Sequence, residues 1–352
     1  MNRDLFDLLT IKLKWHRTMK HYLSNPSVGV VLACYNGEAW IDEAIKSVLS
    51  QTYKFLKLYI VDDGSSDNTV SIINYYAANY PERVLIIPKI GIKGAPSSRV
   101  EAVSNIDDDL VAFIDQDDIW LNDKIEAQVA HMRREKISLS FTDIEIIDHE
   151  GKIQAESSRR ENIKRSSFFC SANTEELTRN LFIYCPIRIG TVLMTKKSFL
   201  DSGGFDVSLF GGEDWEFWVR HAAFGNFIGH LPKITALRRI HSKNTSYKYR
   251  IERLNNWLKA ALQVSQRFHY LKKDLNSFYR LTFYRTIISC LKKNDHDGKN
   301  NVIRLFKAKK IIFSIDVLLA NFISMFWTVV FPVFQILTKV KDKRFLLFWK
   351  FK

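Results

Sequence analysis

Two acidic clusters lie far apart in this chain, and their residue types suit metal and proton chemistry. The first, Asp115-Gln116-Asp117-Asp118, directly follows the apolar run Leu110 to Ile114, and the second is Glu213-Asp214-Trp215. A short, unbroken apolar run is typical of a buried parallel strand, whose carboxyl end opens into a crevice. Carboxylates at such an edge can share a divalent cation with a phosphate. The sequence therefore favours an enzyme.

Strand-like runs alternate with helical patterns over the first two thirds of the chain. The expected strands cover Val28 to Cys34, Leu56 to Val61, Val84 to Ile87, Leu110 to Ile114, Ile137 to Ile147 (one strand or a bent pair) and Ile189 to Thr195. The expected helices cover Ile41 to Ser50, a segment after Asn68, Arg99 to Asn105, and two helices from Arg250 to Lys293 that part near Lys272. Such alternation predicts an α/β fold with a mostly parallel, doubly wound sheet. The polar stretch 148–175 is predicted to be a surface loop.

Charge is distributed unevenly along the 352 residues. Residues 1–230 carry a net charge of −6 and residues 231–352 a net charge of +20. A basic segment binds nucleic acid or an anionic membrane surface, and the apolar content of this one favours the membrane. The four cysteines are scattered without metal or disulfide spacing, so we expect reduced thiols and a cytosolic location.

One stretch near the end, 317–337, has no charged side chain and is long enough to cross a bilayer core of roughly 30 Å. Its polar residues fall on one helical stripe, Pro332 interrupts it, and basic residues flank both ends. An interfacial helix, a membrane span and a buried core helix all remain open. The segment Met1 to Leu23 lacks the apolar core of a signal peptide and is predicted to form an amphipathic helix.

Five motifs in a fixed order carry a family resemblance. They are Val28 to Gly37, Val61-Asp62-Asp63-Gly64-Ser65, Phe113-Ile114-Asp115-Gln116-Asp117-Asp118, Gly203-Gly204-Phe205-Asp206 and Gly212-Glu213-Asp214-Trp215. The chain resembles a family 2 glycosyltransferase with the GT-A fold, of the bacterial cell-surface polysaccharide type. We therefore expect an N-terminal helix (1–26), a GT-A catalytic domain (27–247), a helical extension (248–298) and a basic, apolar, membrane-associating tail (299–352).

The resemblance implies a nucleotide site at the first strands. It places Ala33 and Tyr35 against the base, with Asp63 accepting a hydrogen bond from the base's ring N–H. The alternative interpretation of the Asp63 motif is a strand-ending turn with a helix cap. Arg99 matches an arginine that faces the nucleotide, although Val100 stands where the family usually has Asn. A solvated arginine at a helix start is the competing interpretation.

The resemblance also implies a metal site. Asp115 and Asp117 resemble the Asp-X-Asp motif that presents oxygen ligands to Mn²⁺ or Mg²⁺. Asp117 is expected to ligate directly, and Asp115 to contact the donor's ribose or act outside the first coordination sphere. His241 matches a histidine that completes the metal site or touches the diphosphate, whereas Asp118 is expected to cap the helix near residues 120–132.

On the acceptor side, the resemblance makes Asp214 the general base for an inverting transfer. Glu213, Trp215 and Thr191 are expected to contact the acceptor. For Glu213 and Trp215 the structural alternatives are a charge at a helix N-terminus and a core aromatic residue.

The resulting hypothesis is an inverting, metal-dependent glycosyltransferase at the cytoplasmic face of the cell membrane. Its donor would be a nucleoside-diphosphate sugar, with UDP favoured and dTDP possible, and its acceptor a lipid-linked or surface-polysaccharide precursor. The alternatives are a catalytically silent membrane scaffold and a sugar nucleotidyltransferase, although residues 33–38 lack the basic triphosphate loop that the latter needs. Nucleic-acid binding by the basic tail is less favoured.

Overall fold

The computed structural model describes residues 25–91, 94–166, 173–209, 211–242, 244, 250–292 and 295–308. The chain divides into two compact units, residues 1–268 and 269–352.

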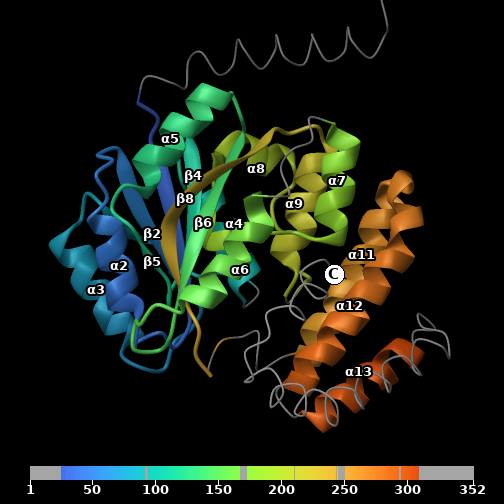
Figure 1. The fold of residues 1–352 in the computed structure, drawn as a ribbon. Coiled ribbons are helices and arrows are strands. Elements are labelled where there is room, and N and C mark those ends of the chain that lie inside the picture. Colours follow the sequence, from blue (N-terminus) through green and yellow to red (C-terminus); the bar gives the residue numbers. More distant parts are fainter. Residues whose placement is uncertain are drawn as a thin grey trace, which may run out of the picture. The chain divides into compact units, whose positions relative to one another are not determined.

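The first unit is built on one eight-stranded sheet, in the order β3-β2-β1-β4-β7-β6-β8-β5 (Figure 1). The strands are β1 (Val28–Cys34), β2 (Leu56–Asp62), β3 (Val84–Ile86), β4 (Leu110–Asp115), β5 (Ile119–Trp120), β6 (Leu139–Ile147), β7 (Leu193–Thr195) and β8 (Ile228–Arg239). β1, β2, β3 and β4 are parallel neighbours, as are β6 and β8, whereas β7 and β5 pair antiparallel. The predicted mixed, mostly parallel α/β sheet is confirmed.

Helices flank the sheet because its central strands are apolar on both sides. Six of the seven residues of β1 are buried, so both of its faces must be covered. The helices of this unit are α2 (Ile41–Leu49), α3 (Thr69–Asn79), α4 (Ala95–Ser104), α5 (Lys124–Glu135), α6 (Ala155–Ser166), α7 (Thr174–Ile183), α8 (Lys196–Asp201), α9 (Glu213–Ala223) and α11 (Arg250–Arg267). In α2, for example, Ile41, Ala44, Ile45 and Val48 recur at helical spacing and are all buried.

Two predictions of local structure were wrong. The stretch 148–175 was expected to be a loop, yet it contains helix α6 and the start of α7. Asn162 on α6 bonds both the N–H and the C=O of Ile144 on β6, so tertiary contacts hold a helix whose own sequence is strongly polar. The expected strand Ile189 to Thr195 is split into a 3₁₀ turn (Ile189–Thr191) and the short strand β7.

The second unit contains a 3₁₀ turn (His269–Leu271), α12 (Lys272–Lys292) and α13 (His296–Ala308). Phe283 on α12 packs its ring 5.1 Å from Phe306 on α13, and both side chains are buried. The predicted pair of helices after residue 250 is confirmed. Among the described helices, none combines the length and apolarity needed to cross a bilayer. The predicted N-terminal helix up to residue 24 and the segment 317–337 lie outside the described residues.

Candidate active site

The carboxyl ends of three parallel strands meet at one edge of the sheet. In the strand register, Cys34 on β1 lies beside Asp62 on β2, and Ala33 lies beside Asp115 on β4. From β1 the chain crosses to β2 on one side and later to β4 on the other. This edge is therefore a topological switch point, the place where open α/β sheets bind ligands.

Tyr35 follows β1 and presents an exposed ring on a fixed backbone. The residue is 56% exposed. Gln116 accepts a hydrogen bond from the Tyr35 N–H at 2.8 Å and donates one to the Tyr35 C=O at 3.1 Å. The amide of Gln116 thus ties the end of β1 to the acidic cluster after β4. Sequence reasoning gave Gln116 no role, although its position between two acids was a usable signal.

The acidic pair after β2 divides into two roles. Asp62 closes the turn by accepting hydrogen bonds from the N–H groups of Gly64 and Ser65, at 3.1 and 3.0 Å. Asp63 accepts a 2.7 Å hydrogen bond from the N–H of Gly94, which directly precedes α4. The strand-ending turn expected as the alternative is therefore present at Asp62. Asp63 lies at the sheet edge, with its carboxylate at the start of a helix.

Arg99 on α4 joins the two acidic clusters. Its guanidinium lies 2.7 Å from Asp115 Oδ1 and 3.2 Å from Glu213 Oε1. The residue is only 7% exposed, so the interpretation as a solvated arginine at a helix start was wrong. The structure uses Arg99 to bring together two carboxylates that are almost one hundred positions apart in the sequence.

Burial and charge act in opposite directions at this junction. Burial raises the pKa of Asp115, and the neighbouring Arg99 opposes that shift. Burial and the nearby Asp214 raise the pKa of Glu213, and Arg99 again opposes the increase. Arg99 therefore favours the ionised form of both carboxylates, of which the Glu213 side chain is 12% exposed and the Asp115 side chain 37% exposed.

Asp117 and His241 form a second contact at the same edge. His241 Nε2 lies 2.8 Å from Asp117 Oδ2, and the side-chain amide of Asn244 donates to the same oxygen at 2.9 Å. The ring of Trp40 stacks on His241 with the centroids 4.0 Å apart. His241 Nδ1 is buried and has no hydrogen-bond partner within the described part of the chain. Trp40 and Asn244 were not identified from the sequence.

Asp117 and His241 are the two predicted metal ligands that the structure brings together. Across the described ranges, no group of three His, Cys, Asp or Glu side chains is arranged to hold an ion. Asp117 and His241 alone supply two donor atoms, at a separation of about that between adjacent ligands of a six-coordinate ion. Mg²⁺ and similar ions are commonly held by one or two protein ligands together with substrate phosphates. The pair fits such a site, whereas Asp115 is already engaged by Arg99.

Asp118 does not cap a helix, contrary to the prediction. Its Oδ1 accepts a 3.0 Å hydrogen bond from the backbone N–H of Arg239 on β8, whereas α5 begins at Lys124 after Asp123. Burial, reinforced by Asp117 and Asp115, raises the pKa of Asp118 well above its ordinary value. Arg239 is 2% exposed and pairs with Glu43 at 2.9 Å. Both residues therefore belong to the supporting structure.

Asp214 lies in the first turn of α9. Its Oδ1 accepts a 2.7 Å hydrogen bond from the N–H of Trp215, and none of the ion pairs in the described ranges includes Asp214. Gly212, with φ of 89°, directly precedes the helix. The carboxylate thus adjoins the paired Glu213 without an ion pair of its own among the described residues.

Two expected acceptor contacts were wrong. Trp215 is 4% exposed, and its Nε1 donates to the C=O of Leu181 at 3.1 Å, so the core interpretation holds. The side chain of Thr191 is completely buried, and its hydroxyl donates to the C=O of Arg188 at 2.7 Å. The burial of both side chains indicates that they serve packing.

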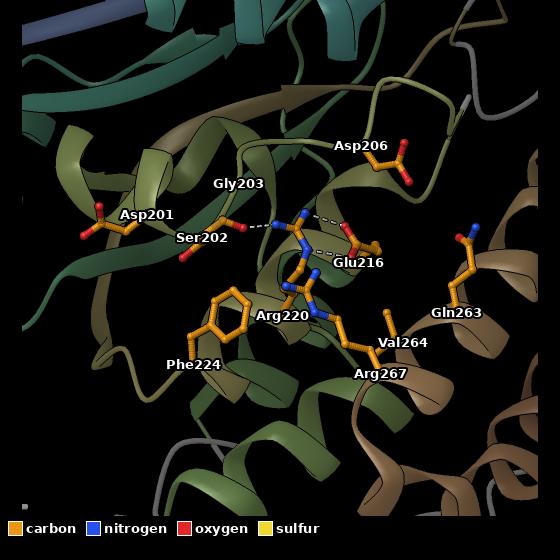
Figure 2. Close-up of a pocket in the computed structure, with 10 residues that line it drawn as sticks. All are labelled: Asp201, Ser202, Gly203, Asp206, Glu216, Arg220, Phe224, Gln263, Val264 and Arg267. Atoms are coloured by element: carbon orange, nitrogen blue, oxygen red, sulfur yellow. Dashed lines mark hydrogen bonds and ion pairs between the residues drawn. The ribbon is translucent and has the colours of Figure 1, made fainter. Parts of the chain in front are cut away.

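A cavity of about 460 Å³ lies elsewhere in this unit, between the turn after α8 and the helices α9 and α11 (Figure 2). Its lining residues are Asp201, Ser202, Gly203, Asp206, Glu216, Arg220, Phe224, Gln263, Val264 and Arg267. Arg220 on its wall is paired with Glu216 at 2.7 Å and donates to two backbone carbonyl groups. None of the site residues predicted from the sequence lines this cavity.

Comparison with known proteins points to one family. Residues 29–204, half of the chain, match the family model for glycosyl transferase family 2. An uncharacterized glycosyltransferase of Rickettsia bellii (strain RML369-C) is 28% identical over 228 residues, which are 65% of this chain and 31% of that protein. The chain thus matches about a third of the length of this curated relative.

Two further similarities bear on fold and family. The UDP-Glc:alpha-D-GlcNAc-diphosphoundecaprenol beta-1,3-glucosyltransferase WfgD of Escherichia coli is 34% identical over 122 residues. These are 35% of this chain and 47% of that protein. The mannosyltransferase PcManGT from Pyrobaculum calidifontis, solved in complex with GDP-Man and Mn²⁺, superposes with a TM-score of 0.56 at 15% identity. That superposition covers 92% of this chain and 89% of the other. At this identity the likeness shows the shared fold alone.

Proposed function

Because the chain belongs to glycosyl transferase family 2, we propose that it transfers a hexose from a nucleoside-diphosphate sugar to an acceptor hydroxyl with inversion. The observation that carries the proposal is the bridge from Asp115 through Arg99 to Glu213. It couples the carboxylates at the sheet edge to the helix turn that carries Asp214. A donor site and a general base in one crevice are what such a transfer needs.

The donor would bind at the ends of β1, β2 and β4. Tyr35 offers an exposed ring on which a base can stack, Ala33 lies two residues earlier in β1, and Asp63 lies at the same edge. Asp115, held by Arg99, would contact the donor's ribose or phosphates indirectly. A UDP-sugar is the favoured donor and a dTDP-sugar the next, since both bases have a ring N–H for Asp63.

Asp117 and His241 would hold Mn²⁺ or Mg²⁺ next to the diphosphate, at the pair of donor atoms described above. When bound, such an ion supplies positive charge that stabilises the departing diphosphate. Trp40 fixes the imidazole ring by stacking, and Asn244 holds the Asp117 carboxylate. These contacts orient both donors, as supporting residues do at metal sites.

Asp214 would act as the general base. Its carboxylate takes the proton of the acceptor hydroxyl while the hydroxyl oxygen forms a bond to the anomeric carbon. The bond from that carbon to the diphosphate oxygen breaks, and its electron pair leaves with the nucleoside diphosphate. Glu213, fixed by Arg99, would keep the first turn of α9 in place and line the acceptor side.

The acceptor would be a lipid-linked or surface-polysaccharide precursor. This inference uses the relative WfgD, whose name specifies a diphosphoundecaprenol acceptor, together with the net charge of +20 over residues 231–352. The basic tail, residues 299–352, would hold the enzyme against the anionic cytoplasmic leaflet. Flotation with vesicles containing phosphatidylglycerol tests this: loss of binding at high salt or without the tail is expected, and no binding by the full chain would refute it.

The function is tested by ligand-induced thermal shift with UDP-glucose, UDP-N-acetylglucosamine, dTDP-rhamnose and GDP-mannose, each with Mn²⁺, Mg²⁺ or EDTA. Wild type is compared with Asp117→Ala and Asp214→Asn. A ligand at one hundred times its dissociation constant stabilises a protein by about 2.7 kcal/mol, a readily measured shift. We expect one donor to stabilise wild type and Asp214→Asn in a metal-dependent way, but not Asp117→Ala.

The donor identified in this way is then used in a transfer or hydrolysis assay. Asp214→Asn should lower the rate by about a thousandfold, consistent with losing a general base. If no donor stabilises the folded wild-type protein, the catalytically silent scaffold becomes the better interpretation. If Asp214→Asn retains the wild-type rate, Asp214 is not the base.

A further inference from the structure

A two-glycine turn leads into the helix that carries Asp214. Gly211 and Gly212 have φ values of 92° and 89°, in the left-handed region that residues with a Cβ rarely adopt. Glycine is required at both positions for this conformation. The turn sets the direction in which the first residues of α9 leave the loop, and therefore the position of the Asp214 carboxylate.

Helix α11 lies directly against this turn. A Cβ added to Gly211 would come within 2.6 Å of Arg253 Cγ, and one added to Gly212 would overlap the indole ring of Trp257. Both α11 residues, one helical turn apart, therefore touch the backbone of the turn. The glycines serve close approach as well as backbone conformation.

The same two α11 residues continue their contacts into α9. The indole ring of Trp257 stacks on that of Trp215, with the centroids 5.9 Å apart and an angle of 23° between the planes. The positive charge of Arg253 lowers the pKa of Glu213, opposing the effect of burial. Glu213 thus has Arg99 on one side and the charge of Arg253 near it, so α11 acts on both the shape and the charge of this turn.

We propose that α11 clamps the Gly211–Gly212 turn and thereby positions Asp214, with Trp257 as the main positioning residue and Arg253 as its partner. The proposal rests on Asp214 being the base of the proposed function. A catalytic group displaced by about 1 Å can cost about a hundredfold in rate, so a clamp on its backbone has a direct catalytic consequence.

The body of α9 is held independently of this clamp. Trp215 Nε1 bonds the C=O of Leu181, Phe217 packs 5.1 Å from Phe205, and His221 Nδ1 lies 2.9 Å from Ser202 Oγ. Removing the Trp257 ring should therefore leave α9 docked and loosen only its first turn. That expectation separates a positioning role from a general contribution to stability.

Hydrogen exchange measured by mass spectrometry tests the clamp without a substrate. The N–H of Trp215 bonds Asp214 Oδ1 and the N–H of Glu216 bonds the C=O of Gly212, so both amides report on the turn. In Trp257→Ala these two amides should exchange about tenfold faster than in wild type, whereas Trp257→Phe should stay near wild type. Val264→Ala is the matched control, because Val264 is a buried α11 residue two turns further along the helix. It should lower the melting temperature without changing exchange in the turn.

Rate and affinity complete the test. With the donor that gives the largest shift among the four nucleotide sugars above, kcat should fall at least about tenfold in Trp257→Ala, while the thermal shift by UDP and Mn²⁺ is retained. Unchanged exchange in Trp257→Ala would overturn the proposal, and so would an unchanged kcat. Asp214→Asn separates this proposal from the proposed function. A full rate in Asp214→Asn would refute Asp214 as the general base. Hydrogen exchange in Trp257→Ala would still decide whether α11 holds the turn.

Discussion

The two sides of the candidate site are built by different means. On the proposed nucleotide side, Tyr35, Asp63 and Asp115 lie at the ends of three neighbouring parallel strands, so the strand register alone brings them to one edge. On the base side, Asp214 depends on a two-glycine turn, on the buried body of α9 and on α11. Secondary structure positions the first set, whereas tertiary contacts between distant segments position the second.

Arg99 is the contact that joins the two sides, and this gives the largest expected effect. Arg99→Met leaves the largely buried Glu213 without this cation, and removing one partner of a buried ion pair typically costs about 3–5 kcal/mol. The contribution of Asp115 is smaller, because its side chain is 37% exposed and solvent screens it. We expect a lower melting temperature, weaker UDP binding and a rate reduced at least about a hundredfold. Calorimetric unfolding, UDP titration and donor turnover measure the three quantities.

Arg99→Lys is the matched control. Lysine keeps the charge but lacks the planar fork that reaches both carboxylates, so it can pair with only one of them. We therefore expect an intermediate loss, in either UDP binding or rate but not in both. If Arg99→Met weakens UDP binding but leaves turnover at saturating donor unchanged, the two sides work independently, and the bridge to Glu213 is only structural.

The body of α9 should respond to acid through His221. Burial lowers the pKa of His221 from 6.5 to about 3. Between these pH values the unfolded chain binds a proton that the native protein does not, so the free energy of unfolding falls as the pH falls. The contribution is about 1.4 kcal/mol per pH unit.

His221→Phe removes this titration. Between pH 7 and pH 5, the free energy of unfolding of wild type should therefore fall by about 2 kcal/mol more than that of the variant, as measured by urea denaturation at each pH. Loss of the hydrogen bonds of His221 with Ser202 and Ser138 in the variant lowers its free energy of unfolding equally at every pH. It therefore changes only the offset between the two pH profiles. Parallel pH profiles would show that the imidazole does not resist protonation.

The nucleotide side alone should respond to Tyr35, with the smallest expected effect. Tyr35→Ala removes an exposed ring, so stability should be unchanged, while UDP affinity in the presence of Mn²⁺ should fall about tenfold. Tyr35→Phe keeps the stacking face and should bind like wild type. Titration calorimetry decides: an unchanged affinity in Tyr35→Ala would remove the ring from the base site.

These differences also explain which features were predictable. The strands that end at Cys34, Asp62 and Asp115 are short apolar runs followed by polar residues, and their placement was confirmed to within a residue. Helix α6 was missed because its polar sequence gives no amphipathic signal and Ile144 on β6 supplies its partner. Thr191 and Trp215 matched motif positions, yet only packing decides that their side chains are buried.

The sequence by itself determined the family, through the order of its motifs. It also determined the mixed α/β architecture and the edge at which Tyr35, Asp63, Asp115 and Asp117 gather, because apolar runs with polar ends are local patterns and parallel strands place their carboxyl ends at one edge. The tertiary structure alone decided that Arg99 bridges Asp115 and Glu213, that Trp40 and Asn244 support Asp117 and His241, and that Trp257 lies on Gly212. These contacts join segments separated by many residues, and their geometry follows from how helices pack on the finished sheet, for which no local pattern exists.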